Sequence, residues 1–379
     1  MVILLQFVPL PVEVWKDIPG RAEILAPLDA AGIPFPLGFV SLIPHESLKS
    51  AIWLLPAVGV LLAMMRARAL FSGRRIAVAL VATMSLAVFV GAMQLASGSG
   101  SSLYFYHFTN RGSAVGFFAN ANHMASLLLV AIPFQAALLR GARERKNAWR
   151  MAAITAIAAS FAVTVAGIAV NGSFAGYGLL LPVSLASALI VWGNRKARLA
   201  ALLLACAVGG GMVLILATHD GQALLDQASG MPGGSREVIF ARTLAAIGDF
   251  WPVGTGVGTF AEIYPSYEDP LTVTRTYINH AHNDYLELLL ETGILGLIVL
   301  LGFLLWWVVR AGRIWAGAPT SPFARAAVIA SATLLVHSLV DYPLRTAALS
   351  SLFAACVALM AAPRQSTQVD EREAVFGRG

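Results

Sequence analysis

The sequence predicts an all-α, polytopic membrane helix bundle, and three observations carry this prediction. Of the 379 residues, 58% are hydrophobic, and the mean hydropathy is +0.74. Only 12% are charged, which is about half of the roughly 25% found in soluble domains. The basic residues behind the net charge of +6 form short clusters between apolar runs, as the positive-inside rule produces. Membrane lipids are therefore expected partners, and this clustering argues against nucleic acid.

About nine apolar runs have the roughly 17–25 residues that can cross the hydrocarbon layer of a bilayer. They cover residues 49–65, 76–97, 121–139, 151–170, 174–193, 199–217, 285–309, 323–340 and 345–362. With this count, all five basic clusters fall on one side of the membrane, which the positive-inside rule identifies as the cytoplasm.

The chain is predicted to hold one integral-membrane domain, residues 1–362, and a disordered cytoplasmic tail, residues 363–379. It opens with "MVILLQFVPLP", half of a spanning helix without the basic flank of a signal peptide. We expect either that upstream spans are missing or that this segment is an interfacial helix on the outer surface. The two cysteines lie inside apolar runs, which predicts buried thiols and argues against a disulfide or zinc site.

The polar chemistry is concentrated on the opposite, outer side, chiefly in a long loop at about 218–284. Within it, "SREVIFARTLAAIGDF" at 235–250 has apolar residues at helical spacing, which predicts a short amphipathic helix at the membrane surface. Arg236 and Arg242 flank its apolar stripe and could equally well contact lipid headgroups. The alternating glycines of 254–258 lack the strand and helix of a nucleotide-binding loop, so they predict a close backbone approach instead.

The stretch "NHAHNDYLELLLETGILG" at 279–296 places titratable groups at the start of a long apolar helix. These groups are His280, His282, Asp284, Glu287 and Glu291. Asn283 is a predicted N-cap, the three carboxylates share one helix face, and the histidines lie where the helix dipole favours an anion. Charged groups at membrane depth are costly and therefore indicate function. A zinc site and a purely structural capping role are alternatives, although the spacing is not that of a zinc helix.

Two further polar segments lie at span ends. In "TNRGSAVGFFANANHMASLLL", Arg111 precedes a glycine turn, and Asn120, Asn122 and His123 begin the next span. Such groups can hydrogen-bond a sugar or phosphate, or can cap the helix. After the intramembrane His337, we expect Asp341 and Arg345 to form an ion pair with each other, because they are four residues apart.

These segments resemble those of the O-antigen ligase and polymerase superfamily, bacterial inner-membrane enzymes that act on undecaprenyl-pyrophosphate-linked glycans at the periplasmic face. "NHAHNDYLELLLETGILGL" is similar to the hallmark of the family, and "GFFANANHMA" and "DFWPVGTGVGTFAEIYP" to two further segments, over about 109–345. The resemblance implies glycosyl transfer without a metal or cofactor. An acceptor hydroxyl of lipid A–core, a growing glycan or a protein attacks C1 of the lipid-linked sugar.

Carried over by position, the resemblance implies that His282 is the base or acceptor-orienting group. Arg236 and Arg111 would clamp the pyrophosphate, with Arg242 next, because guanidinium matches phosphate oxygens. The other implied substrate-binding residues are Asn120, Asn122, His280, Asn283, Glu287 and Glu291. The two glutamates would orient His282 or bind sugar hydroxyls.

Two positions depart from the family pattern, and one of them is Ala121, which stands where a proline is common between the two asparagines. Phe174, in "NGSFAGYG", stands where many members carry arginine. The clamp would then be incomplete unless Arg275 or Arg345 substitutes.

Three classes of function fit the sequence to different degrees. Within the transferase class, a ligase-like enzyme is the main hypothesis, with a polymerase or a protein O-oligosaccharyltransferase as alternatives. A transporter of a lipid-linked or anionic substrate would place its polar residues at the bilayer midplane on broken helices, whereas here they gather at the outer surface. An inactive subunit of a cell-envelope complex is the third hypothesis.

Overall fold

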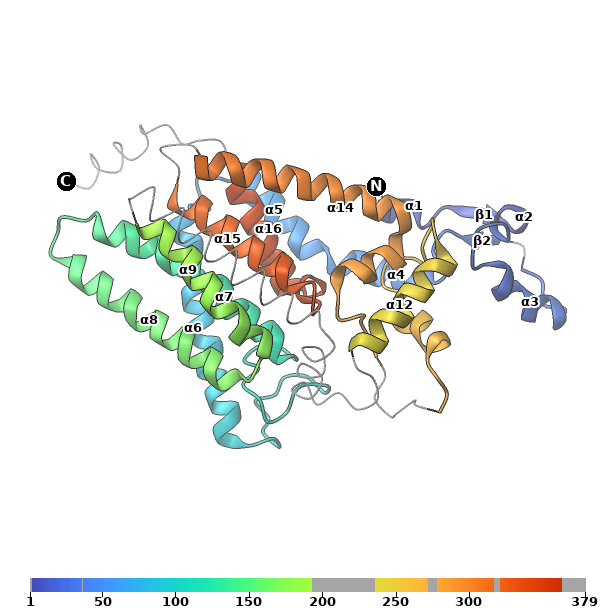
Figure 1. Cartoon of the computed structure of the whole chain (residues 1–379), viewed down its shortest axis with the longest axis horizontal. Helices are drawn as coiled ribbons and strands as arrows, with labels where there is room; N and C mark the ends of the chain where they lie inside the picture. The colour runs from blue at the N-terminus through green and yellow to red at the C-terminus, as the bar shows by residue number, and fades with distance from the viewer. Residues whose placement is uncertain (1, 36, 193–235, 272–277, 317–320, 363–379) are drawn as a thin grey trace.

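The computed structural model describes residues 2–35, 37–192, 236–271, 278–316 and 321–362. Long helices run side by side, and a small amino-terminal unit projects from one end of them (Figure 1). The predicted fold class is confirmed, because the chain is a polytopic helical membrane protein.

Six described helices are long and apolar enough to cross a membrane. They are α4–α5 (Pro44–Arg66), α6 (Gly73–Ser97), α7 (Ala121–Arg143), α8 (Trp149–Asn171), α9 (Phe174–Val191) and α14 (Asp284–Ala316). Two shorter apolar helices follow, α15 (Pro322–His337) and α16 (Ala347–Ala361). These eight helices coincide with eight of the predicted spans, and the predicted span 199–217 lies outside the described residues.

Helix α7 is the centre of the bundle. It contacts α6, α8, α9 and α15, and its middle turns are buried almost completely. Leu128, Leu129 and Phe134 are among its fully buried side chains in the main apolar cluster. The start of α7 is thereby held at a fixed depth, which matters because Asn120, Asn122 and His123 lie there.

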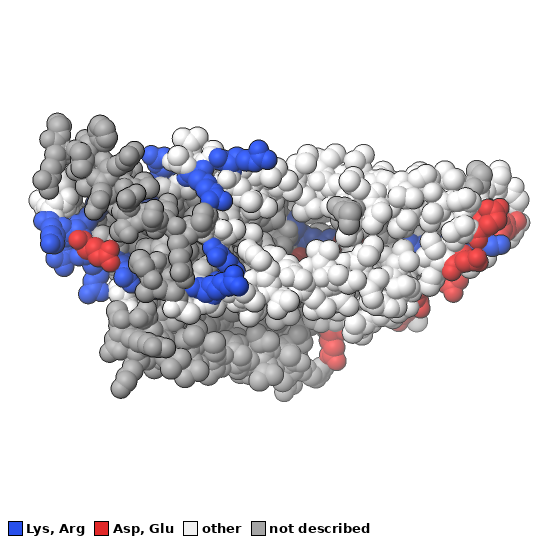
Figure 2. All heavy atoms as spheres, turned by 90° about the horizontal axis from the view of Figure 1, so that it is seen from above, with Lys and Arg blue, Asp and Glu red and all other residues white. Residues whose placement is uncertain are grey.

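Basic side chains gather at one end of the molecule (Figure 2). Arg66 ends α5, Arg143 ends α7 and Arg313 lies in the last turn of α14, while Arg74 lies at the start of α6. This arrangement agrees with the prediction that the basic clusters share one side of the membrane.

The amino-terminal unit differs from the single interfacial helix considered above. Helix α1 (Val2–Leu5) is followed by strand β1 (Pro9–Pro11), which pairs antiparallel with β2 (Leu37–Phe39). Helices α2 (Val12–Trp15) and α3 (Ala22–Ala30) lie between these strands. The prolines of β1 explain the difference, because proline cannot continue a helical hydrogen-bond ladder.

The described part of the long outer loop contains the predicted amphipathic helix, α12 (Arg236–Phe250). It is followed by α13 (Phe260–Ile263) and the 3₁₀ turn η1 (Tyr264–Tyr267). Their buried apolar side chains form a second cluster with the start of α14: Ile239, Ala246, Phe250, Phe260, Tyr264, Ala281 and Leu290.

Helix α14 is interrupted at Gly293, whose φ of 55° and ψ of −141° are not helical. The loop between α12 and α13 fills the break. The amides of Thr255 and Gly256 donate to the carbonyls of Leu290 and Glu291, each at 2.9 Å. A Cβ at Gly293 would lie 2.0 Å from the Pro252 carbonyl oxygen. The close backbone approach predicted for this glycine-rich loop is therefore confirmed, and its partner is the broken helix.

Candidate functional site

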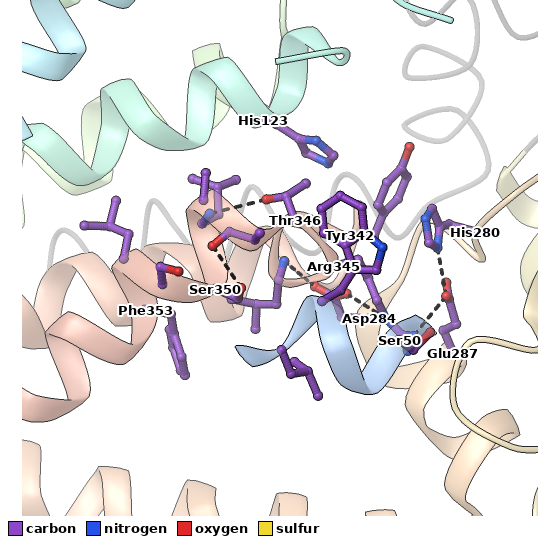
Figure 3. A pocket seen from close by; sticks show the side chains of 18 of the residues that line it. Ser50, His123, His280, Asp284, Glu287, Tyr342, Arg345, Thr346, Ser350 and Phe353 are labelled. Atoms are coloured by element: carbon purple, nitrogen blue, oxygen red, sulfur yellow. Dashed lines mark hydrogen bonds and ion pairs between the residues drawn. The ribbon is translucent and has the colours of Figure 1, made fainter. Parts of the chain in front are cut away.

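A cavity of about 1540 Å³ lies between α5, α6, α14 and α16 and reaches the starts of α7 and α14 (Figure 3). Its polar lining comes from α7, α14 and the turn before α16: Asn120, His123, Asn279, His280, Asp284, Glu287, Glu291, Tyr342 and Arg345. The rest is lined largely by apolar side chains of α5, α6, α14 and α16, such as Leu54, Leu80, Leu300 and Phe353. The cavity therefore has a polar end and a long apolar remainder.

The start of α14 is fixed by Asn283, as predicted. Its side-chain oxygen accepts hydrogen bonds from the amides of Tyr285 at 2.9 Å and Leu286 at 3.1 Å. Its side-chain amide donates to the Leu339 carbonyl at 2.9 Å. This N-cap therefore ties the helix start to the turn after α15, where Asp341, Tyr342 and Arg345 lie.

Asp341 lies between two histidines. One of its oxygens is 3.7 Å from Nδ1 of His282 and 3.9 Å from Nε2 of His123, and the Asn122 amide donates to the other. The Asp341 side chain is fully buried, which by itself would raise its pKa. The neighbouring imidazoles outweigh burial and hold the pKa of Asp341 well below its usual range. Asp341 is therefore a carboxylate.

His282 adopts a left-handed backbone conformation, with φ of 53°, which non-glycine residues rarely adopt. This turn separates the two histidines. His282 points toward Asp341 and is only 7% exposed, whereas His280 lines the cavity.

Tyr342 contacts three histidine rings at the polar end of the cavity. Its ring centroid lies 4.2 Å from that of His280, 4.9 Å from that of His123 and 5.0 Å from that of His282. Burial first, and then the charge of Asp341, raise the pKa of Tyr342, so its hydroxyl stays protonated. Sequence reasoning missed this residue. The available signal was an aromatic side chain directly after a charged residue at a span end, in "DYPLR".

Arg345 binds three carboxylates of α14, two of which, Asp284 and Glu287, are labelled beside it in Figure 3. Its Nη1 is 2.7 Å from Glu291 and 3.3 Å from Glu287, and its Nε is 3.7 Å from Asp284. Burial would lower the pKa of Arg345, but these three carboxylates raise it above its ordinary value. The guanidinium is therefore permanently charged.

The predicted ion pair between Asp341 and Arg345 is wrong. Helix α15 ends at His337, and the 3₁₀ turn η2 (Pro343–Arg345) follows. The two residues are therefore not on one helix face, which the four-residue spacing had assumed.

The two glutamates hold other groups than the predicted one. One carboxylate oxygen of Glu287 lies 2.8 Å from Nδ1 of His280. Its second oxygen accepts a hydrogen bond from the Ala281 amide at 2.8 Å. Glu291 accepts the amide of Gly258 at 2.7 Å. The expectation that they orient His282 is thus wrong, because the carboxylate beside His282 is Asp341. The positive φ of His282 turns its side chain away from the face of α14.

Arg236 is near enough to act on this site electrostatically, but it is not among the described residues that line the cavity. It is the first residue of α12, is 2% exposed, and acts electrostatically on Tyr342. Arg242 is partly buried and near Tyr264, where it partly offsets the rise that burial causes in the pKa of that phenol.

Arg111 lies apart from this group. It is exposed, and its guanidinium donates to the Ser99 carbonyl at 2.9 Å and lies 5.5 Å from the Tyr104 ring. Arg111 is not among the described residues that line the cavity.

The amides at the start of α7 belong to the site. Asn120 caps α7 by accepting the Asn122 amide at 2.8 Å, and its side chain also hydrogen-bonds Tyr342. The Asn122 oxygen accepts the Ser173 hydroxyl at 2.7 Å. The next residue, Phe174, is 46% exposed and packs edge-on against Tyr177.

No replacement for the missing cation is visible in the described part of the chain. Arg275 lies outside the described residues, and Arg345 is engaged by carboxylates. In that same part of the chain, histidine, cysteine and acidic side chains form no group of three that could hold a metal ion.

One comparison with known proteins finds a match to part of this chain. The family model described as O-antigen ligase matches residues 159–301, which include α12, the glycine-rich loop and "NHAHNDYLELLLETGIL". The segment "GFFANANHMA" lies before the match. A comparison with curated proteins finds no match. The resemblance to the O-antigen ligase superfamily, whose members are membrane glycosyltransferases of the ligase and polymerase type, is therefore confirmed over residues 159–301.

Proposed function

We propose that this protein transfers a glycan from undecaprenyl pyrophosphate to an acceptor hydroxyl on the periplasmic side of the bacterial inner membrane. One observation carries the proposal: His123, His280, Tyr342 and Arg345 line the polar end of a cavity whose remaining length is apolar. The donor has the same two parts, a charged diphosphate next to a long hydrocarbon chain.

The charges fit the chemistry of this step. Departure of a pyrophosphate leaves negative charge, which a preorganised guanidinium stabilises best away from bulk water. Arg236 is proposed to supply that cation, with Arg242 as a further clamp, and Arg111 as a clamp from the separate segment between α6 and α7. His282, held beside Asp341, is proposed to orient the acceptor or to take its proton.

The location follows from charge and topology. With the basic helix ends in the cytoplasm, the cavity opens at the periplasmic face. A lipid A–core acceptor, and hence a ligase-like enzyme, is the main proposal. A glycan polymerase and a protein O-oligosaccharyltransferase use the same donor chemistry and differ only in the acceptor.

Complementation tests the proposal. The full chain is expressed in a strain that lacks its own ligase, and lipopolysaccharide is separated by gel electrophoresis. We expect restored glycan ladders, which His282→Ala and Arg236→Ala abolish at equal expression. Arg150→Ala, at an exposed arginine on the basic end, serves as the matched control and keeps the ladders. Long unligated polymer would identify a polymerase, and an unchanged glycan profile would contradict the proposal.

A further inference from the structure

We propose that His280, with Glu287 behind it, is the group that accepts the proton of the acceptor hydroxyl. This inference rests on the proposed function and concerns which of two neighbouring histidines does the proton transfer. The two differ in access to the cavity. The His280 side chain is 27% exposed and lines the cavity, whereas the His282 side chain is 9% exposed and is absent from the described lining.

Hydrogen bonding fixes which nitrogen of His280 is reactive. Nδ1 lies 2.8 Å from Oε1 of Glu287. Glu287 also accepts the Ala281 amide and lies 3.3 Å from Arg345, so its oxygens act as acceptors. Nδ1 of His280 therefore carries the hydrogen, and Nε2 keeps the lone pair that can take a proton. A base oriented by a buried carboxylate is the usual design for activating a hydroxyl nucleophile.

Packing fixes the plane of the ring. Tyr342 lies against His280 with centroids 4.2 Å apart and an interplanar angle of 33°. Figure 3 shows His280 between Tyr342 and Glu287 at the polar end of the cavity. The rotamer is thus held from one side by a ring and from the other by a carboxylate, and little reorganisation is needed at the moment of reaction.

His282 lacks this combination. Its Nδ1 lies 3.7 Å from Asp341, a longer separation than the 2.8 Å between His280 and Glu287, and its ring packs edge-on to Tyr342 with centroids 5.0 Å apart. Of the two roles considered for His282, its burial favours the orienting one. It supports the Tyr342 ring on which His280 lies.

The acceptor oxygen forms a bond to C1 of the donor sugar, and its proton passes to Nε2 of His280. The bond from C1 to the pyrophosphate oxygen breaks, and its electron pair leaves with the pyrophosphate, whose charge Arg236 stabilises. The protonated His280 is paired with the Glu287 carboxylate, which stabilises the imidazolium, and then releases the proton to solvent.

The experiment uses the full-length protein in lipid nanodiscs, with an undecaprenyl-pyrophosphate-linked glycan and a lipid A–core acceptor. We expect His280→Ala to lower kcat by about 10²–10⁴-fold, with binding of undecaprenyl pyrophosphate unchanged within about twofold. Added imidazole should restore part of the kcat of His280→Ala, which a merely structural loss would not allow. Glu287→Gln should lower kcat less, by about tenfold, without rescue by imidazole. His45→Ala, at a histidine whose side chain is 70% exposed, is the matched control.

Two outcomes would overturn the inference while leaving the proposed function intact. In one, the wild type transfers glycan and His280→Ala keeps its kcat. In the other, imidazole rescues His282→Ala and leaves His280→Ala inactive, which would make His282 the base. A wild-type protein that binds undecaprenyl pyrophosphate but transfers glycan to no acceptor would overturn the proposed function and this inference together.

Discussion

Asp341 and His282 face each other across 3.7 Å at the meeting point of two helix ends, the start of α14 and the turn after α15. The position of each residue therefore depends on both the start of α14 and the turn after α15. Replacement of Asp341 by asparagine keeps the size of the side chain and removes the negative charge that lies beside His282 and His123. We expect kcat for glycan transfer to fall about 10–10²-fold, measured with purified protein. Asp29→Asn, at an exposed aspartate of α3, is the control and should keep full activity.

The same substitution has a defined pH dependence. The pKa of Asp341 is lower in the folded protein than in the unfolded chain, where it is about 3.9. Its contribution to stability is therefore complete above about pH 4 and is lost as the pH falls toward the folded-state pKa. The difference in thermal stability between wild type and Asp341→Asn should be constant from pH 8 to pH 5 and should shrink below about pH 4. A difference that already shrinks between pH 7 and pH 5 would contradict this assignment.

Gly293→Ala tests the break in α14. The substitution places a Cβ 2.0 Å from the Pro252 carbonyl oxygen, at a φ of 55° that favours glycine. We expect a loss of more than about 2 kcal/mol in the free energy of unfolding, seen as a lower Tm in detergent. Gly302→Ala is the control on the same helix, because a Cβ at that position would meet nothing within 4 Å; it should be neutral or stabilising. Equal Tm values for the two variants would refute the docking of the loop.

Arg345→Met tests the charge balance at the start of α14. The change leaves three buried carboxylates without their shared guanidinium, so we expect destabilisation of about 3–5 kcal/mol. Arg345→Lys should recover part of this loss because lysine restores the charge and lacks the planar fork. Arg313→Met, in the last turn of the same helix, is the comparison and should change Tm much less. A Tm of Arg345→Met equal to that of wild type would show that the carboxylates need no cation.

Cysteine labelling tests the orientation in the membrane. In a chain with Cys206 and Cys356 replaced by alanine, Leu271→Cys should react with an impermeant maleimide added to the periplasmic side. Leu271 is 94% exposed, in the outer loop. Arg145→Cys, between α7 and α8, should react only after permeabilisation. The reverse pattern would place the cavity on the cytoplasmic side.

Patterns among residues that are close together in the sequence predicted much of this fold. Apolar runs predicted eight helices that the structure contains, six of them long enough to cross a membrane, and the N-cap role of Asn283 followed from its position before a helix. The glycine-rich loop was expected to approach another backbone closely, and it does. Each of these features depends on residues within about one helix length of each other, where sequence spacing fixes geometry.

Pairings between distant segments could not be predicted in this way. The ion pair of Asp341 and Arg345 was inferred from helical spacing, and the chain leaves the helix before it reaches them. The family resemblance implied that Glu287 and Glu291 orient His282 or bind sugar hydroxyls, but Glu287 lies against His280, and the carboxylate beside His282 is Asp341, 59 residues later. Tyr342 was overlooked because its importance comes from three rings that converge on it from different segments.

The interruption at Gly293 has a consequence for how such proteins can diversify. The membrane-spanning part of α14 contacts lipid. Its first turns are instead held by the glycine-rich loop, whose amides donate to the carbonyls of Leu290 and Glu291. Insertion and chemistry are thus governed by separate stretches of one helix. Mutations in the glycine-rich loop can therefore change the direction of Glu287 and Glu291 without changing how the chain crosses the bilayer.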